Sequence, residues 1–158
     1  METTLVGVIS DTHGLLRPEA VQALTGCERI LHAGDVEDPA ILTALEHIAP
    51  VTAVRGNVDD GPLRSLPLTQ AVQVAGVSIY MVHRPEDLDL DPEAAGFSVV
   101  IFGHTHRPLA EWRGRVLYLN PGSAGPRRFD LPISLARLRI AAGRVEAELV
   151  QLPFSPGR

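Results

Sequence analysis

The sequence predicts a mixed α/β domain in which two β-sheets pack face to face. In the first half of the chain, short apolar segments alternate with helical ones, an order that favours parallel strands joined by helical crossovers. In the second half, pairs of apolar segments flank a glycine, which is the pattern of β-hairpins. Parallel strands from one half and hairpins from the other together predict the two facing sheets.

The first half predicts three strands and two helices. Residues 5–10 (LVGVIS) form an apolar run of strand length, and a helix over residues 18–24 begins with a proline, which fits the first helical turn. A second strand covers residues 29–33, a second helix runs from Pro39 to His47, and a third strand covers residues 51–55. This order predicts a β-α-β-α-β unit.

The second half predicts three hairpins and one further buried strand. The hairpins cover residues 71–82, 112–119 and 133–152, and the separate apolar run VVIF covers residues 99–102. No fixed-period repeat, low-complexity segment or long linker divides the chain. We therefore expect a single domain over residues 1–158.

Composition narrows the class of protein. A chain of 158 residues can bury roughly 70% of the surface that it exposes when unfolded, so it needs no disulfide to stabilise its core. A hydrophobic content of 45% and a charged content of 21% are ordinary for a globular domain. The formal charge of −5 argues against nonspecific binding to nucleic acid, so nucleic acid is expected only as a substrate.

The expected location is the cytoplasm. The longest apolar runs are far shorter than the roughly 20 residues of a membrane-spanning helix, and the first residues do not resemble a signal peptide. The single cysteine, Cys27, cannot form a disulfide within the chain, which agrees with a reducing compartment. A membrane partner is therefore not expected.

Polar side chains of the kinds that bind metals follow five of the predicted strands. In chain order they are Asp11 and His13, Asp35, Asn57, His83, and His104 with His106. Each group alone also fits a structural role, such as a helix cap, a turn or a surface loop. Structural turns have no reason to end strand after strand in Asp, Asn or His, and strand ends are where loops converge on ligands. The joint pattern therefore favours a metal site.

The pair His104 and His106 is the strongest single signal. Successive side chains alternate between the faces of an extended strand, so these two imidazoles are expected to point the same way at the end of the strand. Of the other histidines, His32 lies within a strand next to the site and is expected to pack or support it. His47 ends a helix, where a histidine complements the dipole.

These motifs resemble a known family. In order, Asp11-x-His13, Gly34-Asp35, Gly56-Asn57, His83 and Gly103-His104-x-His106 are similar to the five-part motif of the calcineurin-like metallophosphoesterase superfamily. The short chain and the turn from Asn120 to Ser123 are similar to its small branch, which includes the YfcE-like phosphodiesterases and the retromer subunit Vps29. The resemblance covers almost the whole chain, from Leu5 to about Leu152.

The resemblance implies a four-layer metallophosphatase fold, with two facing mixed β-sheets flanked by helices. It also implies two divalent metal ions that share Asp35. One ion would take Asp11, His13, Asp35 and His106, and the other would take Asp35, Asn57, His83 and His104. Carboxylate, imidazole and amide ligands without thiolate suit Mn, Fe, Zn, Ni or Co, and Mn²⁺ is the expected ion.

The activity implied is hydrolysis of a small phosphate ester, a diester rather than a monoester, by a hydroxide that bridges the two metals. The seven ligand residues would be the catalytic residues through this hydroxide. The alternative is a metal-binding scaffold without turnover on the same fold, as Vps29 is in retromer. A scaffold is free to lose ligands and this chain keeps all seven, which favours the enzyme. A homo-oligomer is compatible with either function.

Two positions depart from the family pattern, and two other classes of metal protein are excluded. Val58 stands where many larger relatives have a histidine that protonates the leaving group, and Arg84 stands where a glycine is usual. Arg84 either changes the loop or contacts the substrate phosphate. A cupin needs another histidine after His106, and an amidohydrolase barrel needs a longer chain.

Overall fold

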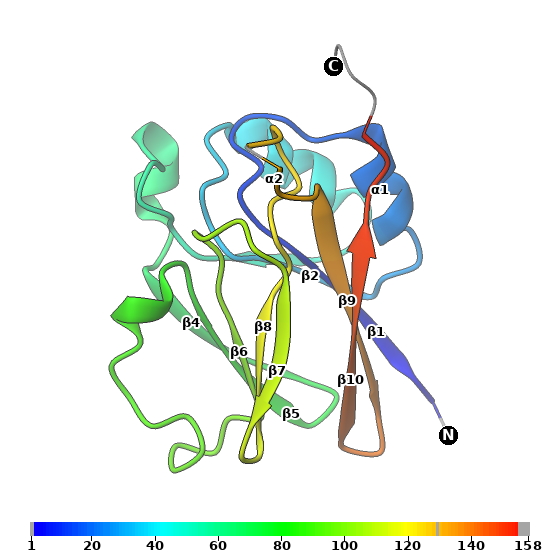
Figure 1. Ribbon diagram of the computed structural model, residues 1–158, viewed down its shortest axis with the longest axis vertical. Coiled ribbons are helices and arrows are strands. Elements are labelled where there is room, and N and C mark those ends of the chain that lie inside the picture. Colours follow the sequence, from blue (N-terminus) through cyan, green and yellow to red (C-terminus); the bar gives the residue numbers. More distant parts are fainter. Residues whose placement is uncertain (1, 129, 155–158) are drawn as a thin grey trace.

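The computed structural model describes residues 2–128 and 130–154 and contains two five-stranded sheets (Figure 1). The first sheet has the order β10-β9-β1-β2-β3, in which β1, β2 and β3 are parallel and β9 and β10 are antiparallel to their neighbours. Its strands are β1 (Thr4–Ile9), β2 (Arg29–His32), β3 (Val51–Ala53), β9 (Ser134–Ala141) and β10 (Arg144–Gln151).

The second sheet has the order β4-β5-β6-β8-β7. Strands β5, β6 and β8 are parallel, and the edge strands β4 and β7 are antiparallel to their neighbours. Its strands are β4 (Thr69–Val74), β5 (Val77–Val82), β6 (Val99–Ile101), β7 (Leu109–Arg113) and β8 (Val116–Asn120). Both sheets are mixed, so the predicted fold class is confirmed.

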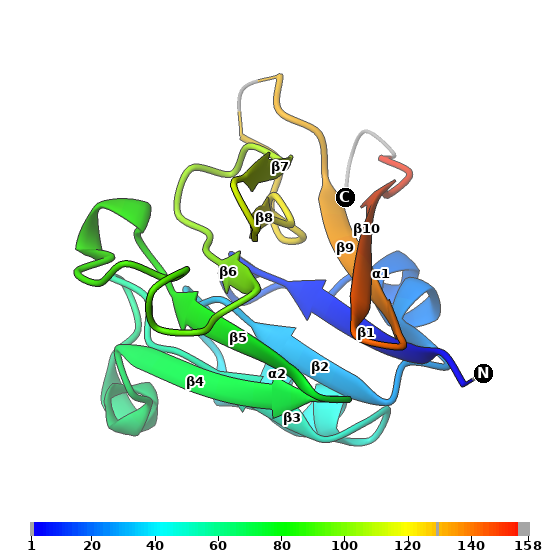
Figure 2. The same cartoon turned by 90° about the horizontal axis from the view of Figure 1, so that it is seen from below.

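The main core lies between the two sheets, which form two layers in Figure 2. Val6 and Val8 alternate along β1 and meet Ile79, Met81 and Ile101 of the second sheet, all fully buried. The parallel register of β1 and β2 sets Val8 opposite Leu31, so the same face of both strands is apolar. The period-two pattern of the sequence therefore places its apolar side chains between the sheets.

Two short helices cover the outer face of the first sheet. They are α1 (Pro18–Leu24) and α2 (Pro39–Glu46), each with a proline in its first turn. The Asp38 carboxylate accepts a hydrogen bond from the Ala40 N–H at the start of α2. Leu24 and Leu45 are fully buried and belong to a second apolar cluster, with Ile9 and Ile30 of the sheet.

The outer face of the second sheet is covered by the segment between β5 and β6. Within the described residues this segment contains only a short 3-10 helix, η2 (Pro85–Asp87), in place of an α-helix. Leu88, Leu90 and Phe97 pack there against the buried side chains of Tyr80 and Phe102. Another 3-10 helix, η1 (Gly61–Ser65), precedes β4.

The elements agree with the prediction to within a few residues at their ends. The third strand ends at Ala53 and not at Arg55, because the Arg55 N–H bonds to the Pro67 carbonyl outside the sheet. In the part of the chain that the structure describes, no helix is long and apolar enough to cross a membrane. The strands β1, β2, β3, β5 and β6 all end next to a predicted metal ligand.

Candidate metal centre

The backbone at the site adopts a conformation that residues other than glycine rarely take. Eight described residues other than glycine have positive φ, and six of them lie in the site loops. These six are Asp11 (54°), His13 (45°), Asp35 (56°), Glu37 (65°), His104 (70°) and His106 (61°), while Ala75 and Ala142 lie in hairpin turns. Left-handed backbone at a non-glycine residue costs of order 1–2 kcal/mol. Its concentration here indicates a site whose side-chain directions are fixed by strain.

The prediction that His104 and His106 share the face of an extended strand is wrong. Strand β6 ends at Ile101, and both histidines lie beyond it in left-handed backbone. The loop is fixed because the Gly103 N–H bonds to the His83 carbonyl and the His104 N–H bonds to the Asp11 carboxylate. The two rings therefore reach the same site by a turn, and each joins a different cluster.

The first cluster consists of Asp11, His13 and His106, whose ligand atoms all lie within 4.8 Å of one another. The Asp11 Oδ1 atom is 3.3 Å from His106 Nε2 and 3.6 Å from His13 Nε2. The two Nε2 atoms are themselves 3.3 Å apart. One carboxylate and two imidazoles converging on one point form a ligand set for a divalent transition metal.

The second cluster consists of Asp35, His83 and His104, with ligand atoms again within 4.8 Å of one another. Asp35 Oδ2 lies 3.1 Å from His83 Nε2. Asn57 joins this cluster because its Oδ1 is 3.1 Å from His104 Nδ1. All seven predicted ligand residues are therefore brought together, in two groups that agree with the two expected ligand sets.

The two clusters adjoin, and their facing atoms lack partners. His13 Nε2 is 3.7 Å from Asp35 Oδ2, and His83 Nε2 is 3.9 Å from Asp11 Oδ1. Asp11 Oδ1 and His83 Nε2 are both buried without a hydrogen-bond partner. Buried polar atoms are normally satisfied, so a pair of acceptors that face each other this closely fits a bound cation.

The other nitrogen of each imidazole fixes its tautomer. His83 Nδ1 donates to the Ala33 carbonyl at 2.7 Å, and His13 Nδ1 donates to Glu37 Oε1 at 2.8 Å. Both Nε2 atoms therefore turn their lone pairs toward the carboxylates. Metal-binding histidines commonly have such a second hydrogen bond, which orients the ring.

The titration of these groups shows how strongly the site favours positive charge. Burial raises the pKa of Asp11, but the rings of His106 and His13 outweigh it and hold this pKa well below its usual range. Burial also raises the pKa of Asp35, but His83 lowers it, and the pKa of Asp35 is lowered as a result. The nearby Asp11 carboxylate raises the pKa of His13, and Asp35 raises that of His83 against the effect of burial. In the metal-free protein, protons compete for the place of the cations.

Two supporting carboxylates are absent from the sequence prediction. Glu37 orients His13, and the buried Asp59 accepts hydrogen bonds from the backbone N–H groups of Asp35 (3.1 Å), Glu37 (2.9 Å) and Gly56 (2.8 Å). Asp59 thereby ties the loop after β2 to the loop after β3. Each of these acids stands two residues after a predicted ligand, and this spacing is the signal that could have found them.

Hydrogen bonds from neighbouring side chains hold the first loop. The Ser10 hydroxyl donates to Asp11 Oδ2 at 2.6 Å. His32 Nδ1 accepts from the Gly34 N–H, so its Nε2 donates to the Thr12 hydroxyl at 3.1 Å, and Thr12 donates to the Val36 carbonyl. His32 thus supports the loops of Asp11 and Asp35 without belonging to either cluster.

Replacing His32 with asparagine is expected to flatten the pH dependence of stability between pH 6.5 and 4. Burial lowers the pKa of His32 from 6.5 to about 4, so over this range the unfolded chain binds a proton that the folded chain excludes. The exclusion of this proton therefore lowers the free energy of unfolding of the wild type by roughly 3 kcal/mol as the pH falls from 6.5 to 4. Above pH 6.5 His32 is neutral in both states, and nothing is lost. The asparagine of the variant keeps an acceptor for the Gly34 N–H but does not titrate.

Urea unfolding of both metal-free proteins at several pH values measures this difference. The difference in free energy of unfolding between the wild type and His32→Asn should become smaller as the pH falls from 7 to 4.5. His47→Asn, at the exposed end of α2, is the matched control. Parallel curves for wild type and His32→Asn would contradict the assignment of this titration to His32.

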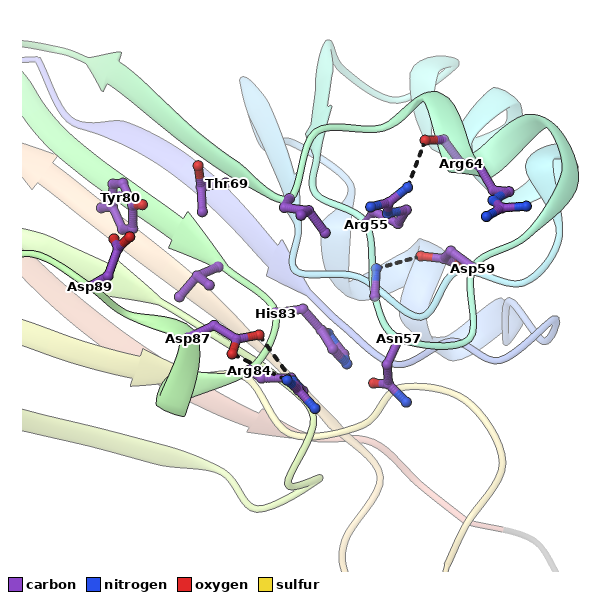
Figure 3. Close-up of a pocket in the computed structure, with 13 residues that line it drawn as sticks. Arg55, Asn57, Asp59, Arg64, Thr69, Tyr80, His83, Arg84, Asp87 and Asp89 are labelled. Atoms are coloured by element: carbon purple, nitrogen blue, oxygen red, sulfur yellow. Dashed lines mark hydrogen bonds and ion pairs between the residues drawn. The ribbon is translucent and has the colours of Figure 1, made fainter.

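The two departures from the family pattern have structural explanations. Arg84 has φ −101°, a conformation open to any residue, so the loop does not need glycine there. Its guanidinium donates to both carboxylate oxygens of Asp87, at 3.0 and 3.2 Å, beside His83 and Asn57 (Figure 3). Val58 is 42% exposed, and its N–H donates to Asp35 Oδ1.

Comparison with known proteins agrees with this arrangement. Residues 5–143 match the calcineurin-like phosphoesterase superfamily domain. The chain is 36% identical to a probable metallophosphoesterase of Methanothermobacter thermautotrophicus over 159 aligned residues, covering 93% of this chain and 92% of the relative. It is 32% identical to the phosphodiesterase YfcE of Escherichia coli over 157 aligned residues, covering 82% and 84%.

The fold also has solved counterparts. Vacuolar protein sorting 29 from Cryptosporidium parvum superposes with a TM-score of 0.76 at 20% identity, over 94% of this chain and 97% of that one. This likeness extends to the arrangement of the sheets alone. The sequence match over most of the chain is what identifies the family, and the chain belongs to the calcineurin-like phosphoesterase superfamily.

Proposed function

We propose that this chain is a phosphodiesterase that depends on two divalent metal ions, with Mn²⁺ as the expected ion. The observation that carries the proposal is the pair of buried, unpartnered atoms, Asp11 Oδ1 and His83 Nε2, which face each other at 3.9 Å. Without a cation between them, neither atom has a hydrogen bond to offset the loss of water on folding. A metal ion satisfies both.

The chain's own residues divide into two ligand sets around Asp35. Asp35 Oδ2 lies close to a histidine of each cluster, at 3.1 Å from His83 Nε2 and 3.7 Å from His13 Nε2. It is therefore the ligand suited to bridge the two ions. Asp11, His13 and His106 complete one set, and Asn57, His83 and His104 complete the other.

Two such ions supply an activated water for attack on phosphorus and stabilise the charge that develops there. The side chains hold the ions so that no protein nucleophile is needed. Cys27 is buried beneath α1 and is not a candidate nucleophile. Arg84, held by Asp87 beside the ligands, is placed to contact a substrate phosphate.

The leaving group has no histidine at position 58 to protonate it. The valine side chain cannot donate a proton, and the Val58 N–H already donates a hydrogen bond to Asp35 Oδ1. The alcohol then takes its proton from water or from another side chain, so esters of acidic phenols are expected to react faster than esters of alkyl alcohols. Equal rates on both classes of ester would contradict this part of the proposal.

The substrate is proposed to be a small phosphodiester. The YfcE relative is named a phosphodiesterase, which supports a diester over a monoester. The competing function is a metal-binding scaffold without turnover. The structural likeness to vacuolar protein sorting 29 is the reason to test it. A cytoplasmic location and the absence of a membrane partner are parts of the same proposal, and a homo-oligomer is compatible with it.

Replacing His83 with alanine is expected to lower manganese-dependent hydrolysis of bis-p-nitrophenyl phosphate at least a hundredfold, that is by about 3 kcal/mol or more in barrier height. The assay uses metal-stripped protein with and without Mn²⁺, beside p-nitrophenyl phosphate as the monoester. His47→Ala is the matched control, because His47 lies at the exposed end of α2.

Each result discriminates between the two functions. Turnover that requires Mn²⁺, favours the diester and disappears in the His83 variant supports the enzyme. Two bound ions without turnover of either ester would favour the scaffold. Turnover that His83→Ala leaves unchanged would remove the proposed site from the reaction.

A further inference from the structure

A cavity beside the candidate metal centre is bigger than a single phosphate requires. It has a volume of about 730 Å³ and begins at Asn57 and His83. Figure 3 shows Arg55 and Arg64 at one end of this cavity and Tyr80 and Asp89 at the other, with His83 between them and Asn57 below Arg55. The two ends of the cavity are therefore lined by side chains of different charge.

Three arginines line this cavity in a chain whose formal charge is −5. Arg84 is neutralised by two hydrogen bonds to Asp87. Arg64 forms a long ion pair with Asp60 at 3.8 Å, and its side chain is 71% exposed. Arg55 differs from both, because no described acidic residue forms an ion pair with its guanidinium.

Arg55 is held in place by neutral groups instead. Its Nη1 donates to the Arg64 carbonyl at 3.1 Å, and its backbone N–H donates to the Pro67 carbonyl at 2.8 Å. The residue is half-buried, while the hydrogen bond of its guanidinium lies at the exposed surface. A positioned guanidinium without a counter-ion is suited to bind an anion.

The acids in the cavity leave this charge available. Asp59 is buried, and both its oxygens accept backbone N–H groups. Asp87 is bound to Arg84, and Asp89 lies at the opposite end beside Tyr80 (Figure 3). Arg55 is therefore the cation at its end of the cavity that forms no ion pair with a described residue.

The position of Arg55 beside Asn57 fits an anion that lies next to the scissile phosphate. Arg55 and Asn57 are two residues apart, so their Cα atoms are at most about 7 Å apart. Gly56 between them cannot carry a side chain, because a Cβ there would overlap Asp35. Arg55 thus belongs to the same rigid loop as a proposed metal ligand while its charge lies to one side of the ligands.

We infer that Arg55 forms a subsite for a second phosphate of the substrate, so that the preferred substrate is a phosphodiester with a further phosphate on one of its alcohol arms. This inference rests on the proposed function for the position of the scissile phosphate. Arg55 determines specificity and takes no part in bond breaking. Arg64, more exposed and already paired, contributes less.

The first test is equilibrium binding, which does not depend on turnover. Thymidine 3′,5′-bisphosphate and thymidine 5′-monophosphate are titrated by calorimetry into protein at a fixed concentration of free Mn²⁺. The wild type should bind the bisphosphate about tenfold more tightly, as expected for a charge-assisted hydrogen bond. Arg55→Gln should lose this preference, Arg55→Lys should keep part of it, and Arg144→Gln, an exposed arginine at the start of β10, should keep it whole.

The second test measures hydrolysis of the dinucleotide TpT beside pTpT and TpTp, which add one terminal phosphate at either end. At least one of the longer substrates should have a kcat/KM about tenfold above that of TpT in the wild type, and Arg55→Gln should abolish that ratio. Bisphosphate and monophosphate that bind equally to folded wild type would overturn the subsite even if bis-p-nitrophenyl phosphate is hydrolysed. A binding preference that depends on Arg55 without any turnover would support the subsite and refute the hydrolase.

Discussion

Replacing Asp35 with asparagine should abolish metal-dependent hydrolysis while leaving the fold intact. Asp35 Oδ1 accepts the Val58 N–H at 3.0 Å, and Oδ2 faces the histidines of both clusters. An asparagine keeps the first contact through its amide oxygen. Its amide nitrogen can donate to His83 Nε2, so no buried group is left unsatisfied. The loss is therefore one of negative charge and of the bridging oxygen.

The expected effect is large because Asp35 is the proposed ligand of both ions. Hydrolysis of bis-p-nitrophenyl phosphate with Mn²⁺ should fall at least about a thousandfold, which corresponds to roughly 4 kcal/mol. Metal content after equilibrium dialysis, measured by mass spectrometry, should fall below that of the wild type. Unfolding of the metal-free variant should require less urea than that of the wild type at pH 7, because the lowered pKa of Asp35 means that its charge stabilises the fold.

Asp60→Asn is the matched control, since the Asp60 side chain is 84% exposed and lies on the loop beyond Asn57. It should retain both activity and metal. Full metal content in Asp35→Asn would show that the two clusters bind independently, and the bridging role would then be wrong. A metal-free variant that does not fold at all would show that Asp35 is needed to fold the loops, whatever its role in binding metal.

The convergence of the candidate ligand residues could be predicted from the sequence, for a physical reason. Strand ends are visible in a sequence because apolar runs stop there, and Asp, Asn and His are distinctive when they follow such runs. Asp11, Asp35 and Asn57 follow the parallel strands β1, β2 and β3, whose ends meet at one edge of the first sheet, and His83 follows β5 of the second sheet. The fold and the meeting of these residues both follow from the same alternation of apolar and polar segments.

The directions of these side chains could not be predicted in the same way. His104 and His106 were expected to share a face because extended residues two apart do so, yet both have left-handed backbone. Periodicity describes regular structure, and left-handed residues other than glycine are set by tertiary contacts. Here such a contact is the bond from the His104 N–H to Asp11, 93 positions away in the chain. No local pattern encodes it.

The supporting carboxylates were missed for a related reason. Glu37 and Asp59 look like ordinary loop acids in sequence, and only the folded chain shows that one orients His13 and the other binds three backbone N–H groups. The spacing of two residues recurs in Asp11 with His13, Asp35 with Glu37, Asn57 with Asp59, and His104 with His106. A turn that aims one side chain inward thus brings the residue two positions later to the same site.

Replacing Gly56 with alanine should damage both stability and activity, because the glycine lies against the proposed bridging ligand. A Cβ at position 56 would overlap the Asp35 carboxylate and the Asp35 backbone nitrogen. Neither group can retreat easily, since the Asp35 N–H is bonded to Asp59 and its carboxylate to the Val58 N–H. Relief of this overlap must move the loop after β2 or the loop after β3.

We expect Gly56→Ala to lower the free energy of unfolding by about 3 kcal/mol, as overpacking in a rigid region does. The kcat/KM of the folded protein should fall at least about a hundredfold, because shifts of about 1 Å in a ligand have effects of this size. Gly76→Ala separates the two causes. Gly76 has φ +81° in a hairpin turn with open space around it, so alanine there is strained by backbone conformation alone. It should cost about 1 kcal/mol and leave hydrolysis unchanged. Equal effects of the two substitutions on activity would show that the position of Asp35 is not fixed by its contact with Gly56.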